Sequence, residues 1–168
     1  MNAFPEVIQS ITLRPCQEKD ASFLFKVYAS TREDEMALVD WTQSQKDAFL
    51  HMQFTAQRQY YVANYPGAQF LVIFLDDQPI GRLYIHKKMN EILIMDIALL
   101  PKYRNAGIGS SIILDLQGEA RVSGSLIRLH VESFNPAINL YRRLGFIKTG
   151  EISFYHEMTW QPEVMNHV

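Results

Sequence analysis

A short run near the middle of the chain, Arg104-Asn105-Ala106-Gly107-Ile108-Gly109, followed by Ser110, has the make-up of an anion-binding loop. It follows an apolar run and precedes an amphipathic stretch, which indicates a strand leading directly into a helix. The first N–H groups of such a helix have no partner within it and lie at the positive end of its dipole. Gly107 and Gly109 let a ligand approach the backbone, and Arg104 can bind an oxygen with two hydrogen bonds. We therefore predict a phosphate or pyrophosphate site, with a plain turn and helix cap as the alternative for the loop taken alone.

Two common nucleotide-binding motifs do not fit this loop. A P-loop ends in Gly-Lys followed by Ser or Thr, whereas Gly109 is followed by Ser110 and Ser111. The dinucleotide fingerprint needs a third Gly or Ala three residues after the second Gly, and Ile112 lies there. A generic nucleotide-binding domain is therefore disfavoured.

The elements around the loop alternate between strands and helices. Residues 91–99 predict a long strand buried on both faces, and residues 126–131 predict the next one. Between them lies a helix that follows Gly109 and ends at Ser123-Gly124. Its expected buried positions are Ile112, Ile113, Leu116 and Ala120, and its expected water-facing positions are Asp115, Gln117, Glu119 and Arg121. The remaining elements are a short helix over residues 135–144 and closing strands over residues 146–148 and 153–160.

The first half of the chain predicts two helices and a hairpin. Asp20 precedes apolar residues at helical spacing, and an acidic connector over residues 31–35 then leads to a second helix over residues 42–61. The expected strands are residues 11–14, 70–75 and 80–86, with turns at 64–67, 76–79 and 87–90. These elements predict one mixed α+β domain over residues 1–168, around one central sheet with a βαβ crossover in its second half.

Composition argues against several classes of function. The 168 residues are 48% apolar and 20% charged, as in a globular domain. The net charge of −2 argues against nucleic-acid and anionic-membrane partners. A single cysteine, Cys16, allows no intrachain disulfide, and the histidines lack metal-ligand spacing, so no metal is expected. Because residues 1–11 show no secretory pattern and no apolar run is long enough to span a bilayer, we expect a cytoplasmic protein.

With these elements in place, the chain resembles the GNAT superfamily of N-acetyltransferases. The family loop reads Arg/Gln-x-x-Gly-x-Gly/Ala, and Arg104, Gly107 and Gly109 match it. Residues 95–104 are similar to the family's fourth strand running into that loop. Further matches lie in its later motif: Leu129-His130-Val131, Asn135, Ala137, Leu140-Tyr141 and Leu144-Gly145-Phe146. The resemblance covers residues 91–148 and is only architectural before them. It implies a mixed, mostly antiparallel twisted sheet of about seven strands, with helices on both faces and a splay between the fourth and fifth strands.

The resemblance also implies acetyl-CoA as co-substrate and a role for each matching position. Residues 104–109 and Ser110 would hold the CoA pyrophosphate through backbone N–H groups. The strand end Ile97-Ala98-Leu99 would pair with the pantetheine arm, and N–H groups there would polarise the thioester carbonyl. Asn135 and Tyr141 would face CoA. Tyr141 is expected to donate a proton to the departing thiolate, with a core aromatic role as the alternative.

Two carboxylates compete for the role of general base. Glu91 begins the fourth strand where some family members, including histone-type acetyltransferases, carry a base glutamate. Asp96 lies five residues further on, so strand alternation places it on the opposite face. An Asp in so apolar a strand also requires a partner. A structural role for each residue, and a water chain in place of a dedicated base, remain alternatives.

The acceptor is expected to be a primary amine, either a small molecule or a peptide. The acidic connector Arg32-Glu33-Asp34-Glu35 would attract a cationic amine, although a solvated helix end has the same composition. Tyr60, Tyr61, Tyr65 and Phe70 line an acceptor pocket or form an aromatic core. A monomer and a homodimer paired through residues 153–160 both fit. The alternative function is a non-catalytic GNAT-fold module that binds CoA or acyl-CoA.

Overall fold

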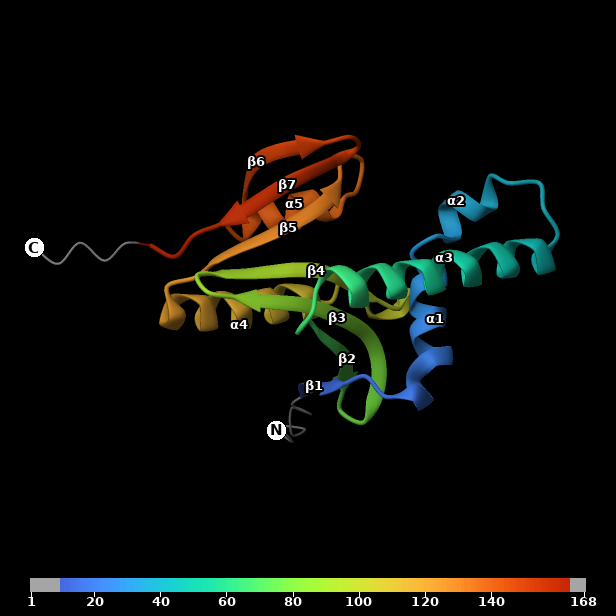
Figure 1. The fold of residues 1–168 in the computed structure, drawn as a ribbon, viewed down its shortest axis with the longest axis horizontal. Coiled ribbons are helices and arrows are strands. Elements are labelled where there is room, and N and C mark those ends of the chain that lie inside the picture. Colours follow the sequence, from blue (N-terminus) through green and yellow to red (C-terminus); the bar gives the residue numbers. More distant parts are fainter. Residues whose placement is uncertain (1–9, 164–168) are drawn as a thin grey trace, which may run out of the picture.

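A seven-stranded sheet runs through the part of the chain that the computed structural model describes, residues 10–163, in the order β1-β2-β3-β4-β5-β7-β6 (Figure 1). Its strands are β1 (Ile11–Pro15), β2 (Gln69–Leu75), β3 (Gln78–Lys88), β4 (Glu91–Leu99), β5 (Leu126–Glu132), β6 (Ile147–Ile152) and β7 (Tyr155–Trp160). Strands β4 and β5 are parallel, and the other neighbours are antiparallel. The mixed, mostly antiparallel sheet is therefore confirmed. Residues 1–9, in which the sequence shows no secretory pattern, lie outside the described residues.

Helices cover both faces of this sheet (Figure 1). They are α1 (Ala21–Ser30), α2 (Glu33–Ala37), α3 (Gln43–Asn64), α4 (Ile108–Ser123) and α5 (Ala137–Arg143), with short 3-10 turns at Glu18–Asp20 and Pro101–Tyr103. Helices α1 and α3 lie on one face, while α4 and α5 share the other with the main apolar core. Helix α2 begins within the segment 31–35 that the sequence predicts as a connector and extends past it, so that prediction was incomplete.

Helix α4 carries the βαβ crossover between β4 and β5. Its predicted apolar positions are all buried, and Gly124, with φ 69°, ends it as expected. Two details differ from the prediction. The helix begins at Ile108, so Gly109 lies in its first turn. Gln117 is buried rather than water-facing, because its Nε2 donates to the carbonyl of Leu144 at 2.8 Å, at the end of neighbouring helix α5.

A β-bulge changes the faces of strand β4. Tyr84 of β3 pairs with Asp96, but the next residue of β3 pairs with Ile94, so Met95 is an extra residue in β4. The extra residue means that each β4 side chain after Met95 lies on the face opposite to the one that simple alternation from Glu91 would give. Because Glu91 and Asp96 lie opposite Lys88 and Tyr84, which are four residues apart on β3, both carboxylates are on the same face. The prediction that they lie on opposite faces was wrong.

Strand β4 is also less buried than its sequence predicts. Ile92 and Ile94 are buried against α4, but the other residues of the strand are half-buried. The half-buried residues lie on both faces: Ile97 and Leu99 pack against the apolar core, whereas Asp96 and Ala98 lie on the opposite face. The prediction of a strand buried on both faces was therefore wrong.

The opening lies between β4 and β5. These strands pair over Glu91–Ile94 and Leu126–Leu129, and past that point β4 continues beside β3 while β5 continues beside β7. The two strands therefore diverge towards their carboxyl ends, which is visible where β5 leaves β4 in Figure 1. The splay between the fourth and fifth strands is confirmed.

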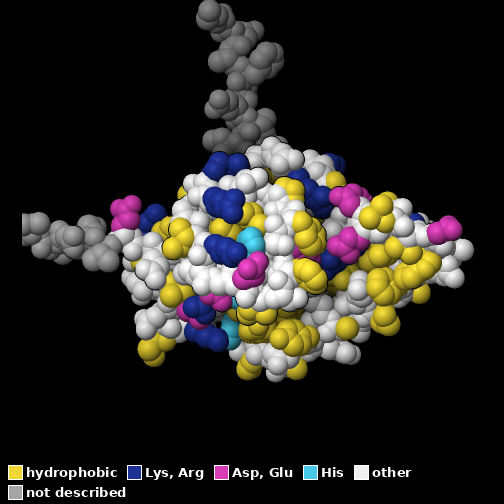
Figure 2. All heavy atoms as spheres, turned by 90° about the horizontal axis from the view of Figure 1, so that it is seen from above, with side chains coloured by type: hydrophobic (Ala, Val, Ile, Leu, Met, Phe, Trp, Pro, Cys, Tyr) yellow, Lys and Arg dark blue, Asp and Glu magenta, His cyan; other side chains and the backbone are white. Residues whose placement is uncertain are grey.

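The surface carries charges of both signs. Seen from above, basic and acidic side chains are interspersed over the β6–β7 layer, and hydrophobic side chains gather at the end formed by α2 and α3 (Figure 2). Leu38 and Trp41, in the connection between these helices, are among the exposed apolar residues. Across residues 10–163, no helix combines the length and apolar character that crossing a membrane requires.

Candidate active site

A cavity of about 240 Å³ lies where β4 and β5 diverge. It is bounded by α1 and α3 on one side, by β3, β4 and β5 at the sheet, and by α5 and β7 on the other side. The lining residues are Tyr28, Thr31, Arg32, Gln57, Tyr61, Arg82, Ile94, Met95, Asp96, Ile97, Ala98, Leu129, His130, Val131, Glu132, Asn135, Tyr141 and Tyr155. Of the four aromatic residues expected at an acceptor pocket, Tyr61 lines it.

The loop between β4 and α4 presents a row of unbonded backbone N–H groups. Asn105 and Gly107 have φ values of 58° and 82°, which turn the chain sharply into α4. The first N–H of this region that bonds within the helix is that of Ser111, which donates to the Gly107 carbonyl. Among the described residues, none accepts a hydrogen bond from the N–H groups of residues 105–110. Six consecutive donors at a helix N-terminus form an arrangement that can bind a phosphate.

The side chain of Arg104 connects this loop to β4 and α1. Its Nε donates to the Leu99 carbonyl at 2.9 Å, and its Nη2 lies 3.3 Å from the hydroxyl of Ser30 at the end of α1. The sequence predicts that this guanidinium binds a ligand oxygen with two hydrogen bonds. In the structure the guanidinium joins the loop to β4 and α1 through its Nε and Nη2.

The carboxyl end of β4 forms one wall of the cavity. Ile97 and Ala98 line it, whereas Leu99 packs against the apolar core. Gly81 of β3 lies opposite this segment, and a Cβ added there would lie 2.2 Å from the carbonyl oxygen of Ala98. The close approach of the two strands therefore depends on Gly81 having no side chain.

Tyr141 reaches the cavity from α5. Its side chain is buried, and no other described residue receives a hydrogen bond from its hydroxyl. Burial, together with the negative charge of Asp96, raises the pKa of Tyr141 to about 12. The phenol therefore keeps its proton at neutral pH, as a proton donor must.

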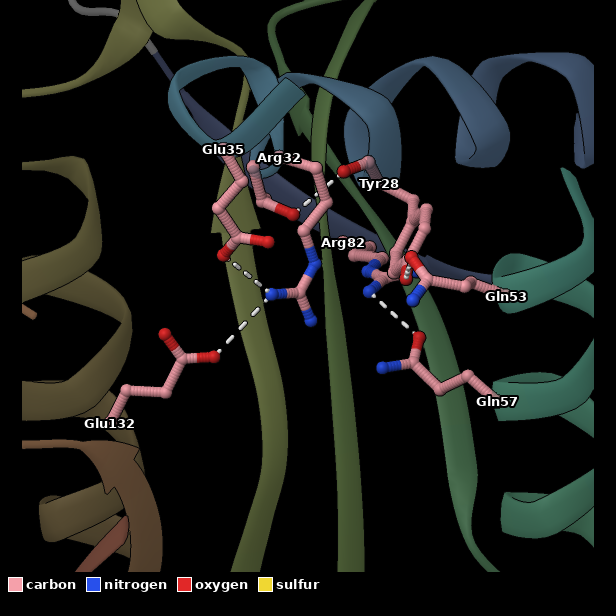
Figure 3. A network of polar contacts seen from close by, with 8 residues as sticks. Tyr28, Arg32, Glu35, Gln53, Gln57, Arg82 and Glu132 are labelled. Atoms are coloured by element: carbon pink, nitrogen blue, oxygen red, sulfur yellow. Dashed lines mark hydrogen bonds and ion pairs between the residues drawn. The ribbon is translucent and has the colours of Figure 1, made fainter. Parts of the chain in front are cut away.

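Asp96 lines the same cavity and is paired with a buried arginine. The Nε of Arg82 donates to Asp96 Oδ2 at 2.5 Å, and Arg82 is 2% exposed. The Nη2 of Arg82 donates to Gln57 Oε1 on α3 at 3.1 Å (Figure 3). Sequence reasoning found that Asp96 needs a partner but did not identify Arg82, because β3 and β4 have to pair before the two side chains meet.

Glu91 lies outside the cavity. Its carboxylate pairs with Arg128 of β5 at 2.6 Å, at the end of β4 where the two strands are still joined. The structure thus separates the two carboxylates by position along the strand rather than by face. Asp96 is at the opening, and Glu91 is at the closed end.

An ion pair bridges the mouth of the cavity. Arg32 follows α1, and its Nη1 lies 3.0 Å from Glu35 Oε1 and 3.4 Å from Glu132 Oε1 at the end of β5 (Figure 3). Figure 3 shows Arg32 lying between these two carboxylates. Part of the acidic connector is therefore neutralised by its own arginine, through the local pair of Arg32 and Glu35. The pair with Glu132 is not apparent from sequence spacing, because Glu132 is distant along the chain.

Asn135 lies beside this mouth and lines the cavity. Its Oδ1 accepts a hydrogen bond from the N–H of Ala137 at 2.9 Å, in the first turn of α5. Asn135 therefore orients the helix that carries Tyr141. Over residues 10–163, no group of three or more His, Cys, Asp or Glu side chains is arranged to hold a metal ion.

Comparisons with known proteins agree with this geometry. A model of the acetyltransferase (GNAT) family matches residues 32–146, whereas no curated protein matches significantly. A PaiA N-acetyltransferase from Thermoplasma acidophilum, solved with coenzyme A, is similar with a TM-score of 0.70 and 18% identity, over 91% of this chain and 99% of that one.

Two further solved structures are similar over 90% of this chain. Arabidopsis thaliana Naa50, in complex with the bisubstrate analogue CoA-Ac-MVNAL, has a TM-score of 0.62 and 18% identity over 99% of its own chain. A spermidine N-acetyltransferase from Vibrio cholerae, in complex with CoA and spermine, has a TM-score of 0.61 and 17% identity over 95% of its own chain. These likenesses show the fold, and the family model covers more than half of the sequence. The chain therefore belongs to the acetyltransferase (GNAT) family and is an acyltransferase.

Proposed function

We propose that this protein transfers an acetyl group from acetyl-CoA to a primary amine by direct attack in a ternary complex. The observation that carries the proposal is the row of six unbonded backbone N–H groups over residues 105–110, next to the splayed end of β4. An anion site at this junction would hold the pyrophosphate of CoA. The pantetheine arm would then extend along Ile97-Ala98-Leu99, with its thioester in the cavity.

The reaction needs one bond made and one broken. The neutral amine nitrogen attacks the thioester carbonyl carbon and forms the carbon–nitrogen bond. As the tetrahedral intermediate collapses, the carbon–sulfur bond breaks and the nitrogen releases its second proton to solvent. Tyr141 donates its hydroxyl proton to the departing sulfur. The phenol holds this proton at neutral pH, although its raised pKa makes it a weaker acid than an exposed tyrosine. Asn135 positions Tyr141 through the first turn of α5.

The amine must lose a proton before it attacks. Asp96 lines the cavity whereas Glu91 lies outside it, so Asp96 is a better candidate than Glu91 to receive that proton, directly or through water. Its pairing with Arg82 gives it a second role, which is to orient the guanidinium in the cavity.

Two measurements test this function together. Acetyl-CoA at millimolar concentration should raise the melting temperature, and a panel of small-molecule and peptide amines should release free thiol in the presence of the protein. A protein that binds CoA but releases no thiol with any amine would instead be the non-catalytic acyl-CoA-binding module. Stabilisation by ATP but not by CoA would contradict the assignment of the loop.

A further inference from the structure

Strand β6 forms one edge of the sheet and is exposed to solvent along its length (Figure 1). Strand β7 is paired with β5 on one side and with β6 on the other, so residues 155–160 offer no free edge to a second chain. Among residues 10–163, no strand pairs with the outer edge of β6. An edge strand has backbone N–H and C=O groups to which a further strand can bind. A dimer formed at this end of the sheet therefore has to use β6.

The six residues of β6 read Ile-Lys-Thr-Gly-Glu-Ile, which is a symmetric pattern. An isoleucine stands at each end, and a lysine and a glutamate stand at equal distances from the centre. Ile147 and Ile152 are both 65% exposed. When β6 lies antiparallel to its own copy with its centre on a twofold axis, isoleucine faces isoleucine, and Lys148 faces Glu151 of the second copy. The strand is thus self-complementary in charge and in apolar character.

A β-bulge makes this register possible. The pairing of β6 with β7 shifts between Lys148 and Gly150, so Thr149 is an extra residue in β6. Without it, Ile147 and Ile152 would lie on opposite faces, because they are five residues apart. With it, they lie opposite residues of β7 that are four positions apart, and they therefore share one face. The side chains that meet across the twofold axis are on the same side of the joined sheet.

The charged residues of β6 share the other face. Lys148 and Glu151 lie opposite Met158 and His156, which are two positions apart on β7. The Nζ of Lys148 is 3.5 Å from Glu151 Oε2, in agreement with a shared face. Both side chains are open to solvent, with 43% and 56% of their surfaces exposed. Each is therefore accessible to an ion partner on a second chain.

The bulge also determines which strand can pair with β6. A regular strand loses its register where β6 has an additional residue. A second copy of β6 has its own extra residue at the equivalent position, so the two bulges meet at the axis and the register is the same on both sides of it. Residues on one face of a strand also direct their backbone N–H and C=O groups towards the same edge, so the hydrogen-bonding pattern matches together with the faces.

We propose that the protein forms a homodimer in which β6 pairs antiparallel with β6 of a second copy, so that the two seven-stranded sheets become one. Lys148 of each copy lies next to Glu151 of the other on one face, and Ile147 and Ile152 meet on the other face. None of the residues that line the cavity belongs to β6. The inference therefore does not depend on the proposed function, and protein without activity would dimerise equally.

The test exchanges charges across the twofold axis. Lys148→Glu gives each β6 strand two negative residues, and Glu151→Lys gives it two positive ones, so like charges face each other in both homodimers. Each single variant should raise the dimer dissociation constant at least about 10-fold, because like charges directly opposite each other are unfavourable. The double variant Lys148→Glu/Glu151→Lys should return to within about 3-fold of wild type, since opposite charges face each other again. Sedimentation over a dilution series measures the constant, between the 19.5 kDa chain and twice that mass.

Mixing the two single variants gives a second measurement, which loss of folding cannot imitate. Each variant carries the charges that the other lacks, so an equal mixture should form heterodimers about as tightly as wild type forms homodimers. Native mass spectrometry with one variant isotopically labelled distinguishes the heterodimer from the two homodimers. Melting temperatures establish that each variant is folded.

Lys87→Glu is the matched control. Lys87 is also a lysine paired with a carboxylate, that of Glu119, but it lies on β3, which β4, β5 and β7 separate from β6. This variant should dimerise like wild type. Wild-type protein that stays monomeric at every concentration overturns the inference, as does a dimer that both single charge reversals leave unchanged. Absence of heterodimers from the mixture of folded single variants overturns it as well.

Discussion

Asp96 of β4 and Tyr141 of α5 line the same cavity from opposite sides of the splay, and the charge of Asp96 acts on the Tyr141 phenol. After burial, that charge is the second cause of the raised pKa of Tyr141. The pair thus places an anion and a protonated phenol around one cavity, although the two residues come from elements far apart in the sequence. This arrangement leads to the first two predictions.

Tyr141→Phe should remove the proton donor and leave the fold intact, because the hydroxyl bonds to no described residue. We expect kcat to fall by about 10²- to 10⁴-fold, the range of general acid catalysis, with little change in the Kd for acetyl-CoA. Steady-state thiol release and calorimetry measure the two quantities. Full activity in this variant would assign the proton transfer to water.

Asp96→Asn and Glu91→Gln form a matched pair, since each removes the charge of a carboxylate that is paired with an arginine. Asp96→Asn should lower kcat/KM by at least about 10-fold, because it removes the proposed proton acceptor from the cavity. Glu91→Gln should change kcat/KM by less than about 3-fold and act on stability only. The reverse order of effects would restore Glu91 as the base.

Gly107→Val should weaken the binding of CoA. A β-branched residue at φ 82° strains the loop, which would displace the first N–H groups of α4. The Kd for CoA should rise about 10-fold, while the Kd for pantetheine, which lacks the pyrophosphate, should change little.

The control for this loop variant is Gly124→Val, at the other end of the same helix. Gly124 has φ 69°, and an added Cβ would meet nothing within 4 Å, as at Gly107. Both variants should lose a similar stability, on the order of 1–3 kcal/mol. If Gly124→Val weakened CoA binding equally, the effect at Gly107 would be one of stability alone.

Gly81→Ala should disturb the wall of the cavity. Its Cβ would lie 2.2 Å from the Ala98 carbonyl oxygen, so β3 and β4 must separate locally. We expect a lower melting temperature and a rise in the KM for acetyl-CoA. Gly118→Ala is the control, because Gly118 lies within α4 with nothing within 4 Å and the change should stabilise the protein by about 0.5–1 kcal/mol. A Gly81→Ala protein as stable and active as wild type would refute the close approach of the strands.

The raised pKa of Tyr141 also predicts how stability varies with pH. Because the folded-state pKa of about 12 lies above the ordinary value of 10.0, the contribution of Tyr141 to stability is complete below pH 10 and is lost as pH rises towards 12. A difference of this size is worth about 2–3 kcal/mol. Urea unfolding between pH 9 and pH 12 should therefore show a steeper loss of stability for wild type than for Tyr141→Phe. Parallel curves would show that the phenol is not perturbed.

Local sequence determined most helices and strands of this protein, and its motifs indicated the family. The strand Glu91–Leu99 has the predicted bounds, Gly124 ends α4, and the motif of Arg104, Gly107 and Gly109 lies at the predicted strand-to-helix junction. Turn residues, caps and apolar periodicity act between neighbours in the chain, so a single sequence contains that information.

The tertiary structure decided what meets in the cavity. The bulge at Met95 placed Glu91 and Asp96 on one face, a register that depends on how β3 pairs with β4 rather than on β4 alone. The partner of Asp96, the bridge from Arg32 to Glu132 and the burial of Gln117 each join elements that are distant in sequence. Such contacts follow from packing the two halves of the sheet and their helices together. Residue spacing therefore predicted the loop at the end of β4, whereas the pairing of Arg82 with Asp96 appeared only in the folded chain.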